Sequence, residues 1–307
     1  MASTGPTTSS ASASNPPPQS ASEAQREANF HCPDELSKFG VELKKLDLSP
    51  TTITHRMGTP CFFGPLSETE LKRIYQIHHP KWDSIPSVDS SLQWGHIAPS
   101  MELELMIEDH FREEFPEELR ESEDLFSLDR YSIFKDSDLE GLSVSFPRLY
   151  RAQASHGSGG YEWRLMSFNF SQKAEYPHGI ISLIQNPRAD DVGEKLTRGE
   201  LVILSVMVAR SMARNNMTSH KKFPVLLFSY FTRKVRIIQA YLDGKLQIAV
   251  SPWIDFTEFK EQNAELVVRW ILSTPCGDTR TEPQPVANPV QLRKPVERKV
   301  KRSRGKN

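Results

Sequence analysis

The sequence has few cysteines, no long apolar run and no charge near its start. Its 307 residues include three widely spaced cysteines, Cys32, Cys61 and Cys276. This number and spacing exclude a small scaffold held by disulfides and a zinc module built on CxxC pairs, so we expect reduced thiols. No apolar run approaches the ~20 residues that a membrane-spanning helix needs. The composition therefore indicates a soluble protein that does not interact with membranes.

The first 22 residues contain no charged and no aromatic side chain, and the first charge is that of Glu23. Such a segment buries too little apolar surface to offset the entropy lost on ordering it. Residues 1–29 are therefore expected to form a disordered, low-complexity region. The segment also lacks the basic start and the apolar stretch of a secretory signal peptide. We therefore expect an intracellular protein.

The end of the chain carries the strongest positive charge. Several prolines precede or interrupt a basic run near the end of the chain. Prolines and repelling charges favour an extended chain, so residues 277–307 are predicted to form a disordered tail. The run has one acid, Glu297, and eight basic residues: Arg293, Lys294, Arg298, Lys299, Lys301, Arg302, Arg304 and Lys306. Such a run is typical of nuclear localisation signals and of nucleic-acid contacts. We favour a nuclear import receptor or another protein as the partner; the alternative is a merely solubilising tail.

An acidic region extends from Glu102 to Glu140, where fifteen acidic residues accompany four basic ones. Its apolar residues recur at helical spacing: Ile107, Phe111, Phe115 and Leu119. The pattern predicts a helix with a solvated acidic face and a buried apolar stripe. The alternative is a surface that binds a basic partner, such as the tail of the same chain. Residues 30–145 as a whole are expected to be mostly helical and irregular.

Residues 146–276 begin with the pattern of a hairpin. Two bulky, alternating stretches, 150–154 and 162–170, flank the glycine-rich loop 156–160. The loop lacks the Gly-Lys-Ser/Thr of a phosphate-binding loop and the Gly-x-Ser-x-Gly of a nucleophile elbow. We therefore interpret it as a flexible connection between two strands. Earlier in the chain, Ser67 to Glu70 have the capping-box pattern, which predicts the start of a helix.

The rest of this region predicts further strands and two helices. Apolar runs mark strands at 179–184, 225–231, 235–242 and 246–250, and the continuous run 225–231 suits a central buried strand. Asp243-Gly244 is a strong hairpin signal. A buried helix is expected over 201–209, and an amphipathic one over 259–271. The predicted fold is therefore α/β or α+β, with a mixed sheet flanked by helices and disordered tails.

Metal-ligand spacing is missing among the nine histidines, since no His-x-x-x-His pair occurs. The adjacent pair His78-His79 would point in directions about 100° apart on a helix. We therefore expect no metal site and no cofactor from the histidines and cysteines.

Residues 180–256 resemble a known family. A strand is followed by Thr197-Arg198-Gly199-Glu200-Leu201 at the start of a helix, then by an apolar strand, the Asp243-Gly244 hairpin and Ile254-Asp255-Phe256. This order is similar to that of uncharacterised fungal proteins with a degenerate restriction-endonuclease-like (PD-(D/E)XK) core. The Arg-Gly-Glu-Leu helix also resembles the region ahead of the catalytic lobe in fungal-type protein kinases.

The nuclease family uses an acid on one strand and Glu-x-Lys on the next to hold a magnesium ion and orient a water molecule. The equivalent stretch here, 182–188, contains no carboxylate and no lysine. Glu162, Asp190 and Arg188 are the remaining candidates for a displaced catalytic site, with Asp191 and Glu194 nearby. The resemblance therefore implies the fold more directly than the reaction.

Two functional hypotheses follow. The first is a non-catalytic interaction or scaffold protein, intracellular and nuclear, that uses its basic tail. The second is a metal-dependent nuclease with a displaced site and a magnesium cofactor. The missing carboxylate and lysine favour the first hypothesis, in which the protein is not an enzyme.

Overall fold

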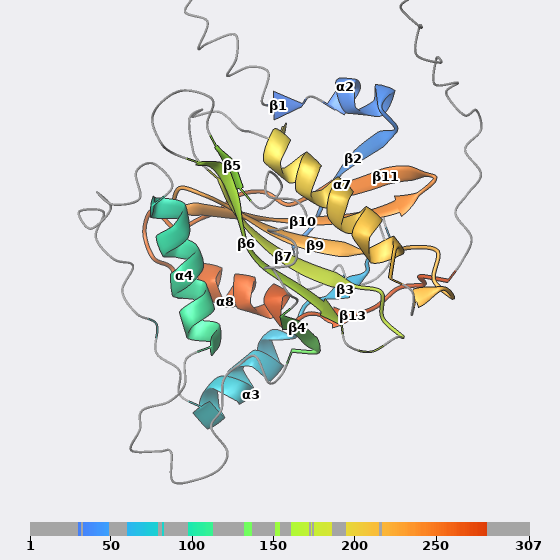
Figure 1. Ribbon diagram of the computed structural model, residues 1–307. Coiled ribbons are helices and arrows are strands. Elements are labelled where there is room, and N and C mark those ends of the chain that lie inside the picture. The colour runs from blue at the N-terminus through green and yellow to red at the C-terminus, as the bar shows by residue number, and fades with distance from the viewer. Residues whose placement is uncertain are drawn as a thin grey trace, which may run out of the picture.

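The computed structural model describes residues 30–31, 33–48, 60–78, 82, 98–112, 132–136, 151–153, 161–171, 173, 175–185, 195–214 and 217–280 (Figure 1). Both predicted tails lie outside these residues, apart from the stretch 277–280. The loop 156–160 and the acidic-region residues 113–131 and 137–140 also lie outside the described residues.

A mixed β-sheet with flanking helices forms the body of the protein, as predicted. Seven strands lie in the order β2-β11-β10-β9-β7-β6-β4, while β5 pairs with β6 and β12 with β10. Their bounds are β2 Val41–Lys45, β4 Phe134–Asp136, β5 Arg151–Gln153, β6 Tyr161–Ser171, β7 Gly179–Gln185, β9 Val225–Phe231, β10 Lys234–Asp243, β11 Lys245–Val250 and β12 Ile254–Asp255. The pairs β7–β9 and β2–β11 are parallel, and the other pairs of this sheet are antiparallel.

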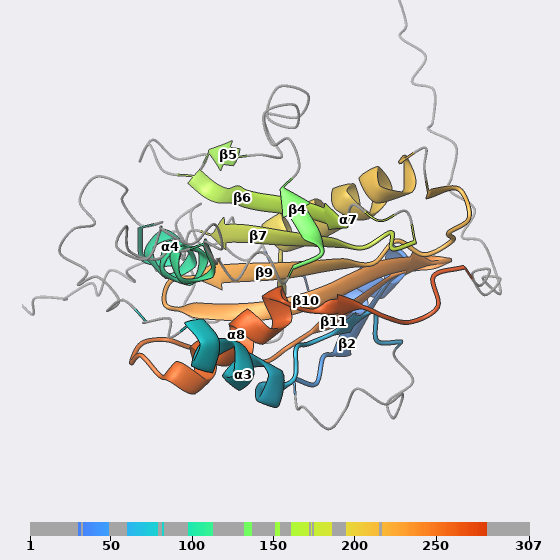
Figure 2. The same ribbon diagram turned by 90° about the horizontal axis from the view of Figure 1, so that it is seen from below.

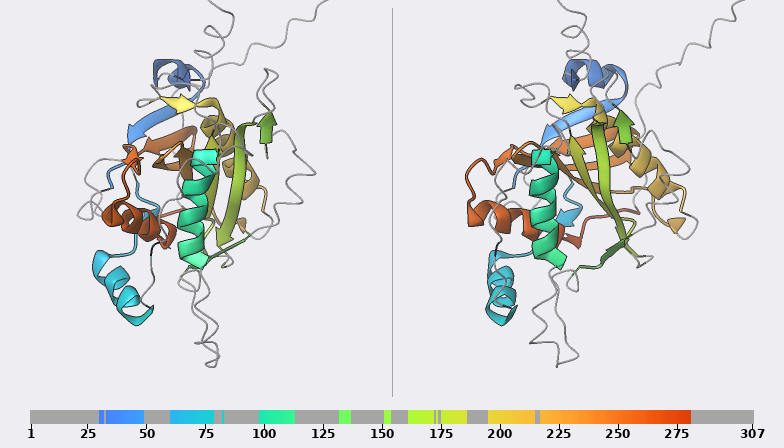
Figure 3. Two further views of the ribbon diagram at one scale, coloured as in Figure 1. Left: turned by 90° about the vertical axis from the view of Figure 1, so that its left-hand side faces the viewer. Right: turned by 60° about the vertical axis from the view of Figure 1, so that its left-hand side comes forward.

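Helices cover both faces of the sheet because successive side chains of a strand point in opposite directions. In β7, Ile180 and Ile184 belong to one apolar core, whereas Ile181 and Leu183 belong to the other. Helices α4 (Ala98–Arg112) and α8 (Glu261–Ile271) contribute to the first core, and α7 (Arg198–Met212) to the second. Figure 2 and Figure 3 show these helices on the two sides of the strands.

The central position predicted for the run 225–231 is confirmed, since β9 lies between β10 and β7. Its residues Val225 to Tyr230 are all buried. Helix α7 connects β7 to β9, which run parallel. A continuous apolar run is what a strand covered on both faces requires, because neither row of side chains reaches water.

Both predicted hairpin pairings are confirmed. Strands β5 and β6 are antiparallel, and β10 returns as β11 with Asp243 opposite Lys245. Gly244, at the turn, has a φ of 67°, in the left-handed region that glycine adopts at the lowest cost. These turns could be predicted because the signal lies in the turn residues themselves.

The helix start predicted at Ser67 is confirmed, but its capping differs; the helices predicted from 201 and 259 begin at Arg198 and Glu261. Helix α3 (Glu68–His78) begins after Ser67, whose hydroxyl accepts from the Glu70 amide at 3.1 Å. The Glu70 carboxylate does not complete a box and pairs with Arg73. The complete capping box belongs to α7, where Thr197 and Glu200 satisfy each other's amides.

The two later helices also depart from expectation in detail. Helix α7 is buried along one side only, since Ser205 and Ala209 are exposed. Phe259 precedes α8 and is 40% exposed, whereas Val267 and Trp270 are buried as predicted. None of the helices in the described part of the chain is long and apolar enough to cross a membrane.

Short strands from the first half of the chain pair with the second half. Strand β1 (Phe30–His31) pairs with β8 (Leu196–Thr197), and β3 (Phe63–Gly64) pairs with β13 (Thr274–Pro275). Strands β2 and β4 extend the two ends of the large sheet, and helix α2 (Pro33–Lys38) precedes β2. The sequence analysis missed these strands: those of two or three residues are too short to show a period, whereas the alternation of Val41 and Leu43 with charged residues in β2 was overlooked.

Candidate functional site

The residues proposed for a displaced catalytic site are not brought together by the described structure. Glu162 lies on β6, but its side chain is outside the described part. Asp190 and Arg188, together with Asp191 and Glu194, lie in the undescribed segment 186–194. The basic residues between Arg293 and Lys306 are also outside. The displaced site therefore stays a hypothesis.

The described structure places a different set of polar residues at this end of the sheet. Gln185, Ser229 and Arg236 lie on β7, β9 and β10, which are neighbouring strands. Their side chains lie on the face of the sheet that α7 covers. On each strand, the residue two positions away belongs to the apolar core beneath α7, and side chains two positions apart on a strand point to the same face. Thr197 and Glu200 come from the start of α7. We call these five residues the buried polar cluster.

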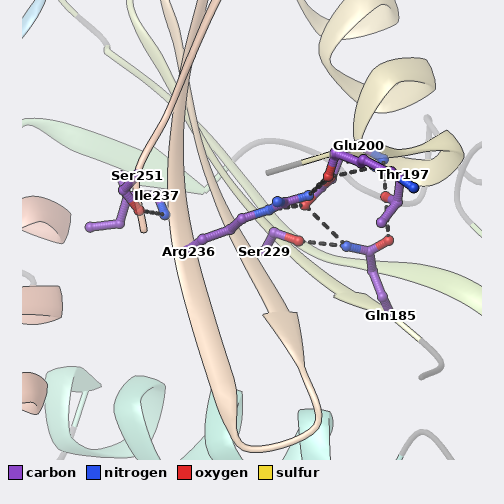
Figure 4. Close-up of polar contacts among 8 residues, drawn as sticks. Gln185, Thr197, Glu200, Ser229, Arg236, Ile237 and Ser251 are labelled. Atoms are coloured by element: carbon purple, nitrogen blue, oxygen red, sulfur yellow. Dashed lines mark hydrogen bonds and ion pairs between the residues drawn. The ribbon is translucent and has the colours of Figure 1, made fainter. Parts of the chain in front are cut away.

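An ion pair between Arg236 and Glu200 lies at the centre of the cluster (Figure 4). The Arg236 side chain is 1% exposed and that of Glu200 is 0% exposed. The Arg236 Nε donates to Glu200 Oε1 at 2.8 Å, and Nη2 donates to Oε2. Nη2 also donates to the Lys195 carbonyl at 3.0 Å, and the guanidinium lies 4.4 Å from the Trp253 ring centre. Two parallel bonds and an aromatic face thus replace part of the water that this charge loses, while the buried Nη1 has no hydrogen-bond partner among the described residues.

Gln185 connects the ion pair to the sheet and to the cap of α7. Its Nε2 donates to Ser229 Oγ at 2.6 Å and to Glu200 Oε1 at 3.3 Å. Its Oε1 accepts a bond of 2.6 Å from the Thr197 hydroxyl, and the Thr197 amide donates to Glu200 Oε2 at 2.8 Å. Both ends of the Gln185 amide are therefore engaged within the cluster.

The backbone at the end of β7 is fixed from the other face of the sheet. Ser100, in the first turn of α4, donates its hydroxyl to the Gln185 carbonyl at 3.0 Å and accepts from the Thr232 amide at 2.7 Å. Thr232 has a φ of 54° in the turn between β9 and β10. The starts of α4 and α7 thus meet the same strand end.

This cluster is closed to metal chemistry in its present arrangement. Each oxygen of Glu200 already accepts two hydrogen bonds, and no other carboxylate belongs to the cluster. A magnesium ion would have to displace Arg236 from Glu200, and the neighbouring Gln185 offers it an amide and no carboxylate. The donor set does not fit the ion. Across the described residues, no three His, Cys, Asp or Glu side chains could hold a metal ion together.

Sequence reasoning missed the cluster, although two signals point toward it. Thr197 and Glu200 have capping-box spacing, and Arg236 is the only charged residue between Val235 and Leu242 of an apolar strand. An arginine in a buried strand requires a buried partner. The identity of that partner could not be read from the sequence, because Glu200 lies 36 positions away.

His178 is a second buried polar residue, 1% exposed, just before β7. Its ring meets that of Phe63 edge-on at 5.1 Å, and Nε2 lies 3.3 Å from the carbonyl oxygen of Cys276, to which it donates. Burial lowers the pKa of His178 to about 4, against the weaker opposite effect of this hydrogen bond. The residue is therefore neutral at physiological pH.

Replacing Arg236 by methionine should destabilise the protein by about 3–5 kcal/mol, because Glu200 would remain charged and buried without its partner. The double variant Arg236→Met with Glu200→Gln should recover a large part of this loss, since it leaves no buried charge. Urea unfolding measures both. As a control, Lys72→Met removes the exposed pair with Glu68 and should cost about 0.5 kcal/mol or less. A loss below about 1 kcal/mol for Arg236→Met would contradict a central role for the pair.

Acid should destabilise the protein through His178. The unfolded chain binds a proton on this residue near pH 6.5, whereas the native state does so only near pH 4. The free energy of unfolding should therefore decrease as the pH falls from about 6.5 to about 4, by up to about 3 kcal/mol. Urea unfolding across this range checks it, and His178→Gln should remove that component. Equal pH dependence of the variant and the parent protein would disprove the assignment.

Comparisons with known proteins return no relative: no protein family, no curated protein and no solved structure matches the chain.

Proposed function

We propose that this protein is a non-catalytic interaction protein, in which a rigid sheet supports a basic segment that binds a protein partner. The observation that carries the proposal is the closed polar cluster at the carboxyl end of β7. Gln185 lies in the stretch where the resemblance places a catalytic acid and lysine, and Glu200 is held by Arg236. The five residues of the buried polar cluster are themselves buried.

The attachment of the C-terminal chain supports the proposal. The Lys221 and Lys222 amides donate to the Thr279 carbonyl at 2.8 and 3.0 Å, and the Thr279 hydroxyl is 2.7 Å from His220 Nδ1. Thr279 is thus held on the body one residue before the described part ends. The basic run, which begins at position 293, follows thirteen positions after Arg280.

The partner that best suits this segment is an acidic groove of a nuclear import receptor. Eight basic residues over fourteen positions match the charge that such a groove selects. We therefore propose nuclear localisation for the protein.

Deleting residues 291–307 should abolish nuclear accumulation of the fluorescently tagged full chain, measured by live imaging. Replacing the eight basic residues of 293–306 by glutamine should do the same, because the charge is lost and the length is kept. A variant in which the residues of 291–307 are kept but their order is shuffled has the same charge and serves as the control for composition. Nuclear entry of the deletion variant, or cytoplasmic residence of the intact chain, would refute the proposal.

One observation favours the second candidate function, a metal-dependent nuclease with a displaced site. In the register of β6 and β7, Trp163 is opposite Gln185, so Glu162 lies beside the point where the segment 186–194 begins. The topology therefore places the Glu162 backbone close to the start of the segment that carries Asp190 and Arg188.

Under the main proposal, the purified full chain should not cleave DNA or RNA in the presence of Mg²⁺ or Mn²⁺. Gel analysis of mixed single- and double-stranded substrates measures this. Cleavage that is lost in Glu162→Ala and in Asp190→Ala, and kept in the control Glu261→Ala at an exposed position of α8, would establish the nuclease and overturn the main proposal.

A further inference from the structure

Two of the three cysteines lie side by side, although 215 positions separate them in the sequence. Cys61 precedes β3 and Cys276 follows β13, and these two short strands pair antiparallel with Phe63 opposite Pro275. The pairing continues past the strands, because the Cys276 amide donates to the Phe62 carbonyl at 3.0 Å. Cys276 therefore lies opposite Phe62, the residue that follows Cys61.

One hydrogen bond joins the two cysteines, and a second holds the Cys61 thiol on the backbone of β3. The Cys276 Sγ donates to the Cys61 carbonyl at 3.3 Å, and the Cys61 Sγ donates to the Phe63 carbonyl at 3.1 Å. Both residues are half-buried and carry free thiols. A small oxidant in solution can therefore reach the pair.

The close approach is built into the backbone at Gly277. A Cβ atom at this position would lie 2.6 Å from the Cys61 carbonyl oxygen and 2.9 Å from Phe62 Cδ1. Gly277 also has a φ of 74°, which side chains other than glycine rarely adopt. Only glycine lets the chain after Cys276 pass so near to Cys61.

The electrostatics of the pair favour reaction at one of the two sulfurs. The hydrogen bond from the Cys276 side chain lowers the pKa of Cys61 to about 7, whereas the same contact raises the pKa of Cys276. This lowered pKa favours the Cys61 thiolate, the form that attacks disulfides. Cys276, whose pKa is raised, stays a protonated thiol and reacts second.

We propose that Cys61 and Cys276 form a reversible disulfide that fastens β13 to β3. A low-molecular-weight disulfide such as oxidised glutathione is the oxidant. The site is independent of the basic segment and of the function proposed for it.

The reaction proceeds by two exchange steps that conserve atoms and electrons. The Cys61 thiolate attacks one sulfur of oxidised glutathione, the glutathione S–S bond breaks, and one glutathione thiolate leaves and takes up a proton. Cys276 then loses its proton to solvent and attacks the Cys61 sulfur, which releases the second glutathione. The two protein thiols are oxidised to one disulfide while oxidised glutathione is reduced to two thiols.

The first step also removes the obstacle to the second. The pKa of Cys276 is raised by its hydrogen bond to Cys61 and by the charge there. Once Cys61 carries glutathione, it is neither a thiolate nor a charged neighbour. Cys276 then ionises more readily and completes the disulfide.

The disulfide would close a loop of more than two hundred residues between the strand before α3 and the strand after α8. Long loops gain the most from closure, because the cross-link restricts the unfolded chain. The oxidised protein should therefore unfold at a Tm about 5–10 °C higher than the reduced protein.

The test uses the full chain, reduced and then equilibrated in buffers of defined reduced-to-oxidised glutathione ratio. Intact mass and peptide mapping without reductant should show a loss of two hydrogen atoms and a Cys61–Cys276 cross-linked peptide. Thermal unfolding should show the higher Tm, and reduction should reverse both changes. The variants Cys61→Ser and Cys276→Ser should each lose the cross-link, whereas the control Cys32→Ser should keep it.

The variants also separate the two roles. Cys276→Ser should accumulate a glutathione adduct at Cys61, because no second thiol resolves it. The proposal is overturned if the parent protein keeps three free thiols in oxidised glutathione, if it stops at the adduct, or if the cross-link includes Cys32.

Discussion

The buried ion pair between Arg236 and Glu200 is the constraint on which the arrangement of the body depends. It joins β10 to the first turn of α7 across the intervening strand β9. Neither charge reaches water, so the position of α7 over the sheet must satisfy both charges together. Gln185 and Thr197 extend the same requirement to the end of β7. An apolar contact could tolerate a shift of α7 along the sheet, but this hydrogen-bonded set cannot.

The same bonds decide what this end of the sheet can do. In open α/β sheets the carboxyl ends of parallel strands, beside a helix N-terminus, are where ligands commonly bind. Here β7, β9 and α7 provide that geometry, yet Glu200 and Gln185 use their polar atoms on each other and on Arg236. The polar atoms of these residues are therefore engaged in holding α7 on the sheet. The described structure brings two thiols together, beside the pair of strands β3 and β13.

Local signals explain which parts of the fold could be predicted. The strand over 225–231 has a continuous apolar run and the β10–β11 hairpin has Asp243-Gly244, so both are written in adjacent residues. The pairs β1–β8 and β3–β13 have two residues in each strand, too few for a period, and they exist because distant segments meet. Capping was predicted at Ser67 on the right pattern, yet Glu70 pairs with Arg73, since a second partner competes for an exposed carboxylate.

The sequence by itself determined the secondary structure of the second half, the mixed sheet with its helices and the segregation of charge into an acidic region and a basic end. These features depend on period and composition, which neighbouring residues carry. Only the tertiary structure decided which polar groups meet. Arg236 contacts Glu200, which is 36 positions away in the sequence, and Cys61 contacts Cys276, which is 215 positions away. Hydrogen bonding and thiol exchange act over a few ångströms, and strand order and register, not sequence spacing, set distances of that size.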